Sequence, residues 1–243
     1  MGAVKRLTLF LAGLLLLPLG WGLGRSLLAL FPHGVIASPP WIEPSLLACC
    51  AGYGLWSLVY LCLPPSIRLY VWGHELTHAI WGLLTGARVG PSRVGRHGGS
   101  VTLSQAGLWT TLAPYFIPFY TLVVVVARLI AGLFIDMNRW APAWMFLVGL
   151  TWGFHITYTL RSLLQRQPDI QTYGRLFSYA LILTLNLLIL GYVIVAATAA
   201  TIPVYHAEIF HQTVTAYRIT ARAGTHLVRQ SARHAGAFAR RIQ

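Results

Sequence analysis

Long apolar stretches separated by short polar connectors run through most of the chain. Six of them can be placed, at residues 7–30, 45–63, 69–86, 106–134, 142–163 and 176–200. A stretch of about 20 apolar residues is long enough for a helix to cross the hydrocarbon core of a bilayer. Backbone groups inside lipid must be satisfied within the spanning structure, which helices achieve and open sheets do not. The pattern therefore predicts an all-α polytopic membrane protein with about six transmembrane helices.

The connector at 87–104 is richer in glycine and arginine than the other connectors. After Gly98-Gly99, the residues from Ser100 to Leu103 alternate in a way that is typical of a β-strand. A Gly-Gly turn beside such a run predicts a small β-hairpin between the third and fourth apolar segments.

Lysine and arginine are unevenly distributed among the ends of the apolar segments. Lys5-Arg6 and the C-terminal tail are cationic, whereas the connector 32–44 contains no lysine or arginine. Cationic connectors usually face the cytoplasm, so we expect both termini there. The arginines of 87–104 would face the opposite side if segment 69–86 crossed completely. This conflict favours a tilted, broken or re-entrant segment, which is tolerated where irregular backbone is buried in protein.

Composition excludes an ordinary soluble domain. Of the 243 residues, 56% are hydrophobic and 9% are charged, with a mean hydropathy of +0.65, whereas soluble domains carry about 25% charged residues. The net charge is +13, and the cations concentrate in short loops and in the tail. Anionic lipid head groups are the nearest partner for such cations, so we expect the lipid bilayer and not nucleic acid as a partner. The five acids are Glu43, Glu75, Asp136, Asp169 and Glu208.

Three parts of the chain are expected to differ in role. Residues 1–68 would form N-terminal transmembrane helices, 69–200 a membrane core that carries the chemistry, and 201–243 a basic tail. In the tail, Arg218 and Arg222 are four residues apart, as are Arg229 and Arg233. That spacing predicts either an amphipathic helix on the membrane surface or a flexible basic segment.

The string Gly73-His74-Glu75-Leu76-Thr77-His78 carries an HExxH motif inside an apolar segment. Residues four apart on a helix lie one turn above each other, so the imidazoles of His74 and His78 can reach one metal ion. Glu75 would project beside them as a general base. Two imidazoles and one carboxylate bind zinc with a coordination position left open for water. Because ionisable groups are costly inside apolar segments, a catalytic zinc site is the expected reason for this string.

A third protein ligand must come from another segment, and three candidates remain open. Asp169 follows Pro168, which would start a helix and place the carboxylate near its N-terminus, either as a ligand or as a cap. His155 lies within an apolar segment, where a hydrogen-bonded core histidine is the alternative. Asp136 lies beside Arg139, with which it would most simply pair.

The arrangement resembles the site-2 protease family of intramembrane zinc metalloproteases, in particular its compact branch without a PDZ domain. The shared features are the HExxH helix, the Gly98-Gly99 connector, an apolar helix containing proline and a later aspartate, and they cover residues 69–190. The resemblance implies that His74, His78 and Asp169 bind zinc and that Glu75 is the base. The Leu-Asp-Gly string that usually surrounds the family's aspartate is absent around Asp169.

The resemblance also implies hydrolysis of peptide bonds in membrane-spanning or membrane-adjacent substrates. The alternative is a noncatalytic membrane protein with a structural or vestigial HExxH site, whose basic tail recruits lipids or a partner. Two further features bear on the core. Pro114 and Pro118 should kink their helix, and Asn186 should form a hydrogen bond between helices.

Overall fold

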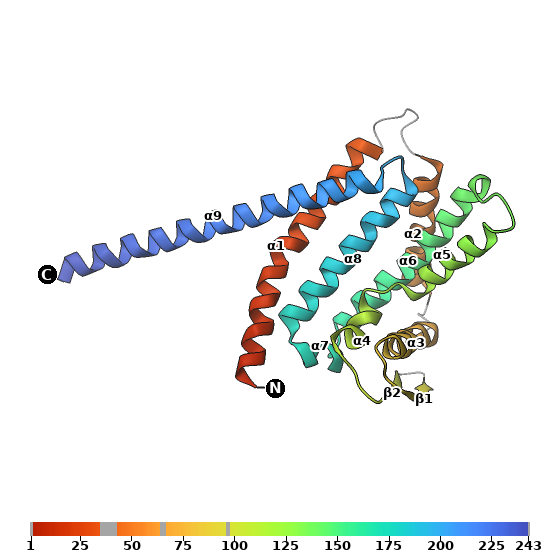
Figure 1. Cartoon of the computed structure of the whole chain (residues 1–243), viewed down its shortest axis with the longest axis horizontal. Helices are drawn as coiled ribbons and strands as arrows, with labels where there is room; N and C mark the ends of the chain where they lie inside the picture. The colour runs from red at the N-terminus through yellow and green to blue at the C-terminus, as the bar shows by residue number, and fades with distance from the viewer. Residues whose placement is uncertain (1, 35–42, 64–66, 96–97, 243) are drawn as a thin grey trace.

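The computed structural model describes residues 2–34, 43–63, 67–95 and 98–242, so most of the connector 32–44 and the tip of the 87–104 connector lie outside the described residues. Within the described part the chain is mostly helical, with one two-stranded antiparallel sheet (Figure 1). The helices are α1 Ala3–Gly34, α2 Pro44–Cys62, α3 Ile67–Leu84, α4 Leu108–Leu112, α5 Phe119–Ala131, α6 Ala141–Leu163, α7 Pro168–Tyr173, α8 Arg175–Ala197 and α9 Ile202–Ile242. Two 3-10 turns, η1 Ala113–Tyr115 and η2 Asn138–Trp140, and two strands, β1 Val89–Val94 and β2 Gly99–Leu103, complete the order.

Three helices in the described part are long and apolar enough to cross a membrane, namely Ala3–Leu30 of α1, α2 and α8. A fourth crossing results if Leu108–Tyr115 and Phe119–Ala131 count as one broken span. These helices indicate a multi-pass membrane protein. The expected number of about six is not reached, because the segments at 69–86 and 142–163 form α3 and α6, which are not among the candidate spans. The polar side chains along α3 and α6, which include three histidines, lower their hydropathy.

The predicted kink is confirmed at the prolines of the fourth apolar segment. The two helical pieces on either side of Phe116–Pro118 meet at an angle of 85°. Pro114 lies in η1, and Pro118 immediately precedes α5. Proline removes a backbone donor and clashes with the preceding turn, so the helix cannot continue straight through this sequence.

α1 and α8 lie side by side and run in the same direction, while α9 runs back along α1. The backbone of Phe177 lies against Gly13, and Thr184 lies against Gly20 about two turns further along both helices. In the opposite sense, Thr213 of α9 meets Gly22, and the hydroxyl of Tyr217 donates to the Leu15 carbonyl at 2.6 Å. Beyond this contact α9 continues away from the bundle as a single helix to Ile242 (Figure 1), so the tail is helical, while its place on a membrane surface stays a prediction.

α2 and α6 approach each other so closely that only glycine fits at two contact points. A Cβ atom on Gly52 would lie 2.0 Å from the Phe146 carbonyl oxygen, and one on Gly149 would lie 1.9 Å from the Cys49 carbonyl oxygen. Small residues of this kind allow helix backbones to pack in direct contact in membranes. The Trp56 indole adds a hydrogen bond of 2.9 Å to the Thr157 hydroxyl.

α3 lies across one end of the bundle. Figure 1 shows it nearly end-on, beside the hairpin and close to α4 and α7, whereas α2, α6 and α8 run along the page. The hairpin is antiparallel, with Val89 opposite Leu103 and Arg93 opposite Ser100, which confirms the predicted strand pair after the third helix. The start of α1 lies at the same end, where the Lys5 ammonium group sits 5.8 Å from the centre of the Tyr173 ring in α7. The arginines of the hairpin and the cations of the N-terminus are therefore at one end of the bundle.

Candidate metal centre

The two histidines of the HExxH motif lie one helical turn apart on α3 and face the same side. Their ring centroids are 4.8 Å apart and the rings are nearly perpendicular, at 82°. Both side chains are largely buried, with 12% of each exposed. Between them, Thr77 bonds back to the Gly73 carbonyl at 2.7 Å, so its hydroxyl is satisfied within the helix and does not compete for the centre.

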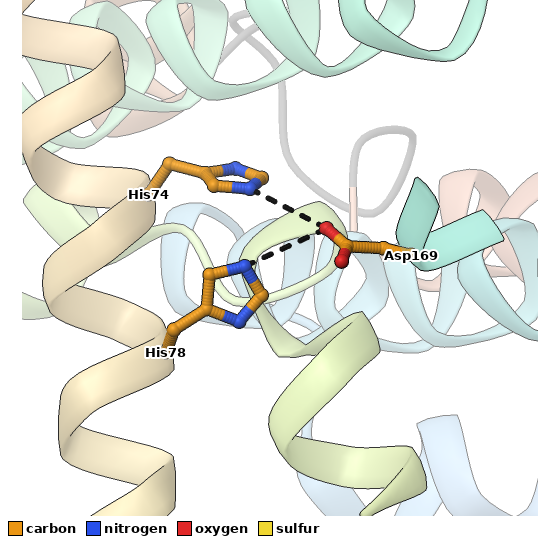
Figure 2. Close-up of side chains that lie close together, drawn as sticks. All are labelled: His74, His78 and Asp169. Carbon is orange, nitrogen blue, oxygen red and sulfur yellow. Dashed lines mark ion pairs between the residues drawn. The ribbon is translucent and has the colours of Figure 1, made fainter. Parts of the chain in front are cut away.

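Asp169 reaches the two imidazoles from α7. Pro168 starts this short helix, and the carboxylate follows in its first turn. Figure 2 shows the carboxylate pointing across to both rings, with its Oδ2 atom 3.8 Å from Nε2 of His74 and 3.6 Å from Nε2 of His78. Among the described residues these three side chains form a group that could hold a metal ion, with one ligand atom each and all three atoms within 4.8 Å of one another.

The spacing of these donors fits a small tetrahedral ion. Zinc bonds of about 2.0–2.1 Å place tetrahedral ligand atoms about 3.3–3.4 Å apart. The observed separations of 3.6 and 3.8 Å between the carboxylate and the imidazoles are a few tenths of an ångström longer. The spacing of the carboxylate from each imidazole is therefore close to that of a tetrahedral site.

The surroundings of His78 fix which ring nitrogen is free to bind. Its Nδ1 atom lies 2.8 Å from the Thr110 carbonyl oxygen. A carbonyl can only accept a hydrogen bond, so Nδ1 carries a proton and Nε2 is the nitrogen left to bind a metal. Metal-binding histidines usually donate their second nitrogen in this manner. His74 lines a cavity of about 20 Å³, which is room for one water molecule.

Asp169 is held by a tyrosine from the kinked segment. The hydroxyl of Tyr115, a residue with no exposed surface, donates to Oδ2 of Asp169 at 3.0 Å. Its ring also stands edge-on to the His74 ring, with 5.2 Å between the centroids. Burial alone would raise the pKa of the Asp169 carboxyl, but the two facing imidazoles lower this pKa well below its usual range. The carboxylate is therefore ionised near neutral pH, which is the form that binds metal.

The other two candidates for the third ligand do not belong to this group of donors. The imidazole of His155 is buried and bonds through Nε2 to the Asn186 side-chain oxygen at 3.3 Å. Asp136 accepts a hydrogen bond of 3.0 Å from the Asn138 backbone in the connector before α6. Asn186 also donates to the Tyr115 carbonyl at 2.9 Å, which confirms the predicted hydrogen bond between helices.

Glu75 lies between the histidines in sequence and borders a larger cavity beside them. It is 9% exposed. Strand β2 packs directly on this turn of α3, since a Cβ atom on Gly99 would lie 2.7 Å from Cγ of Glu75 and 2.6 Å from a methyl of Val71. The adjoining cavity measures about 200 Å³ and is lined by both His74 and Glu75. A metal ion at the three donors would therefore have a further carboxylate and open space on one side.

Two residues of the centre have no signature in the sequence. Tyr115 and Thr110 contact it through a hydroxyl and a backbone carbonyl, from a segment that is otherwise apolar. The prolines around Tyr115 signal a kink, but a kink does not reveal which side chain turns inward.

Comparison with known proteins adds no assignment. No family model, no curated protein and no solved structure matches this chain.

Proposed function

We propose that the protein is an intramembrane zinc metalloprotease that hydrolyses peptide bonds of membrane-spanning or membrane-adjacent substrates. The observation that carries this proposal is the convergence of His74, His78 and Asp169, from two helices far apart in sequence, beside the buried carboxylate of Glu75. Two imidazoles with one carboxylate are the donor set of many catalytic zinc sites. The resemblance of the sequence to the site-2 protease family points to the same chemistry.

In the proposed reaction each residue has one task. His74, His78 and Asp169 would hold the zinc ion. When bound, zinc polarises the scissile carbonyl and makes water a stronger acid. Glu75 accepts the proton of the attacking water and delivers it to the leaving amine, so that proton transfer needs no other group.

The hairpin supplies a means to hold the substrate. A helical substrate hides its carbonyl groups in its own hydrogen bonds, so it must unwind before it can be cleaved. Among the described residues β1 and β2 pair only with each other, so each has an outer edge that no other strand occupies, and β2 packs on α3 next to Glu75. An unwound substrate would pair with a free edge as an additional strand, close to the proposed base.

The distribution of charge suggests an orientation and a set of crossings. The hairpin, α3, α7 and the start of α1 lie at one end of the bundle (Figure 1), and this end carries Lys5, Arg6, Arg68, Arg88 and Arg93. By the positive-inside rule we place it in the cytoplasm, together with the proposed zinc site.

α1, α2, the broken α4–α5 pair and α8 would then cross, while α3 lies across the cytoplasmic end. α6 is not one of these candidate spans, but it packs closely along α2 at Gly52 and Gly149 and would cross beside it. The start of α9 runs back along α1. The positive-inside rule predicts that both termini are cytoplasmic, in which case α9 would be the part of the chain that leads back across.

The experiment compares two substitutions in the purified protein. Glu75→Gln keeps the three proposed zinc donors, so bound zinc should remain near one ion per chain while peptide cleavage is lost. His74→Ala removes a donor, so both zinc and cleavage should be lost. Zinc is measured by mass spectrometry, and cleavage on a membrane-spanning reporter peptide. Cleavage by Glu75→Gln at the wild-type rate would reject the proposal, and bound zinc without any cleavage by the wild type would favour the noncatalytic alternative.

A further inference from the structure

The cavity of about 200 Å³ beside His74 and Glu75 has a strongly polar wall opposite α3. That wall is formed by the last turns of α6 and by the connector that leads to α7. The polar residues that line it are Tyr158, Arg161, Ser162, Gln165 and Gln167. Most ligand cavities are lined mainly by apolar side chains, so a wall with this many polar groups indicates that a polar molecule binds here.

Arg161 is the cation that lines this wall, and no carboxylate among the described residues pairs with it. It is half-buried in the last turn of α6 and forms no ion pair within the part of the chain that the structure describes. Glu75, the carboxylate that also lines the cavity, makes no ion pair with Arg161 and serves as the base in the proposed reaction. A partly buried guanidinium without a counter-charge is costly, and a bound anion would remove that cost.

The geometry of the guanidinium indicates the chemistry of the occupant. Arginine presents paired N–H donors that match a carboxylate, and the neighbouring Ser162, Gln165 and Gln167 supply further neutral donors. The same cavity borders Glu75 and His74, so an anion bound by Arg161 would belong to a molecule that also reaches the metal centre. Peptides carry carboxylates on acidic side chains and at their C-terminus.

We propose that Arg161 forms a carboxylate-binding subsite that selects peptides with a negatively charged group near the bond to be cleaved. This inference rests on the proposed protease function, because it assigns the cavity to the substrate of that reaction. The carboxylate comes either from an acidic side chain or from the end of the substrate chain, and the two sources are separated by the choice of peptide.

The test uses three peptides of otherwise identical sequence. One has a glutamate beside the scissile bond and an amidated C-terminus, one has glutamine there and a free C-terminus, and one has glutamine and an amidated C-terminus. Cleavage by the zinc-loaded full-length protein in detergent gives kcat and KM for each. We expect the wild type to prefer one carboxylate peptide over the neutral one by about tenfold or more, mainly through KM. Arg161→Gln should abolish this preference, and Arg161→Lys should restore part of it.

Arg166 offers a matched control. It is an exposed arginine on the same connector and does not line the cavity. Arg166→Gln removes the same charge a short distance away, so it should leave the preference intact. Equal loss of preference in Arg161→Gln and Arg166→Gln would show a general field effect and overturn the subsite. The absence of any preference in the wild type would overturn it as well.

A binding measurement separates this inference from the proposed function. Fluorescence anisotropy of labelled peptides on the Glu75→Gln variant requires no turnover. A preference for a carboxylate peptide that disappears in the Glu75→Gln, Arg161→Gln double variant supports the subsite even if no peptide is cleaved. Cleavage without any dependence on Arg161 rejects the subsite and leaves the protease proposal standing.

Discussion

Tyr115→Phe tests whether the hydroxyl of a buried tyrosine sets the metal affinity of the centre. The substitution keeps the ring, which packs edge-on against the His74 ring, and removes the hydroxyl that donates a hydrogen bond of 3.0 Å to Asp169. A hydrogen bond to a charged group contributes about 1.5–3 kcal/mol. Loss of the hydrogen bonds that orient a metal ligand typically weakens binding by about 10–100-fold, which corresponds to about 1.4–2.8 kcal/mol. The two estimates agree, so we expect the zinc dissociation constant to rise by about 10–100-fold.

The assay is a competition for zinc between the purified protein and a chromophoric chelator at constant pH. Tyr205→Phe is the matched control, because Tyr205 is also fully buried and its hydroxyl donates to the Leu188 carbonyl at 2.9 Å, away from the centre. Both variants lose one buried hydrogen bond and should lose similar thermal stability, but only Tyr115→Phe should bind zinc more weakly. Wild-type zinc affinity in Tyr115→Phe would refute the view that this hydroxyl orients the carboxylate.

Three further results are expected. Gly149→Ala should destabilise the protein by about 1–3 kcal/mol, because its Cβ would lie 1.9 Å from the Cys49 carbonyl oxygen. Gly54→Ala is the control and should be neutral, because a Cβ there has no atom within 4 Å. Thermal unfolding in detergent compares the two variants. Asp169→Asn should weaken zinc binding by at least about tenfold, whereas Asp136→Asn should leave it unchanged. Equal zinc affinities of these two variants in the chelator assay would argue against Asp169 as a ligand. Zinc affinity should fall as the pH drops from 7 to 5, because protons then compete for the two imidazoles. Asp169, whose pKa is lowered, stays ionised over that range, and a flat profile between pH 7 and 5 would contradict imidazole ligation.

Local sequence patterns predicted much of the fold because each depends on residues close together in the chain. The helical content follows from apolar length, the hairpin from Gly98-Gly99 and the alternation after it, and the 85° kink from Pro114 and Pro118. The number of crossings was not determined in this way. Segment 69–86 is apolar enough to suggest a crossing, but it lies across the end of the bundle as α3 (Figure 1).

The candidate site was likewise predicted only where local sequence determines the geometry. HExxH spacing alone places His74 and His78 on one face of a helix, since a turn of helix has fixed geometry. The third donor could not be chosen among Asp169, His155 and Asp136 from their flanking residues.

The sequence by itself determined that apolar helices dominate the chain. It also determined that one of them carries two imidazoles one turn apart, with a carboxylate between them in sequence. Only the tertiary structure decided that α7 turns Asp169 toward those rings, that Tyr115 holds it there, and that Arg161 faces the adjoining cavity. The physical reason is distance along the chain. Helical periodicity acts over a few residues, whereas Asp169 comes 91 residues after His78, and its position depends on how α6, α7 and the kinked segment pack together.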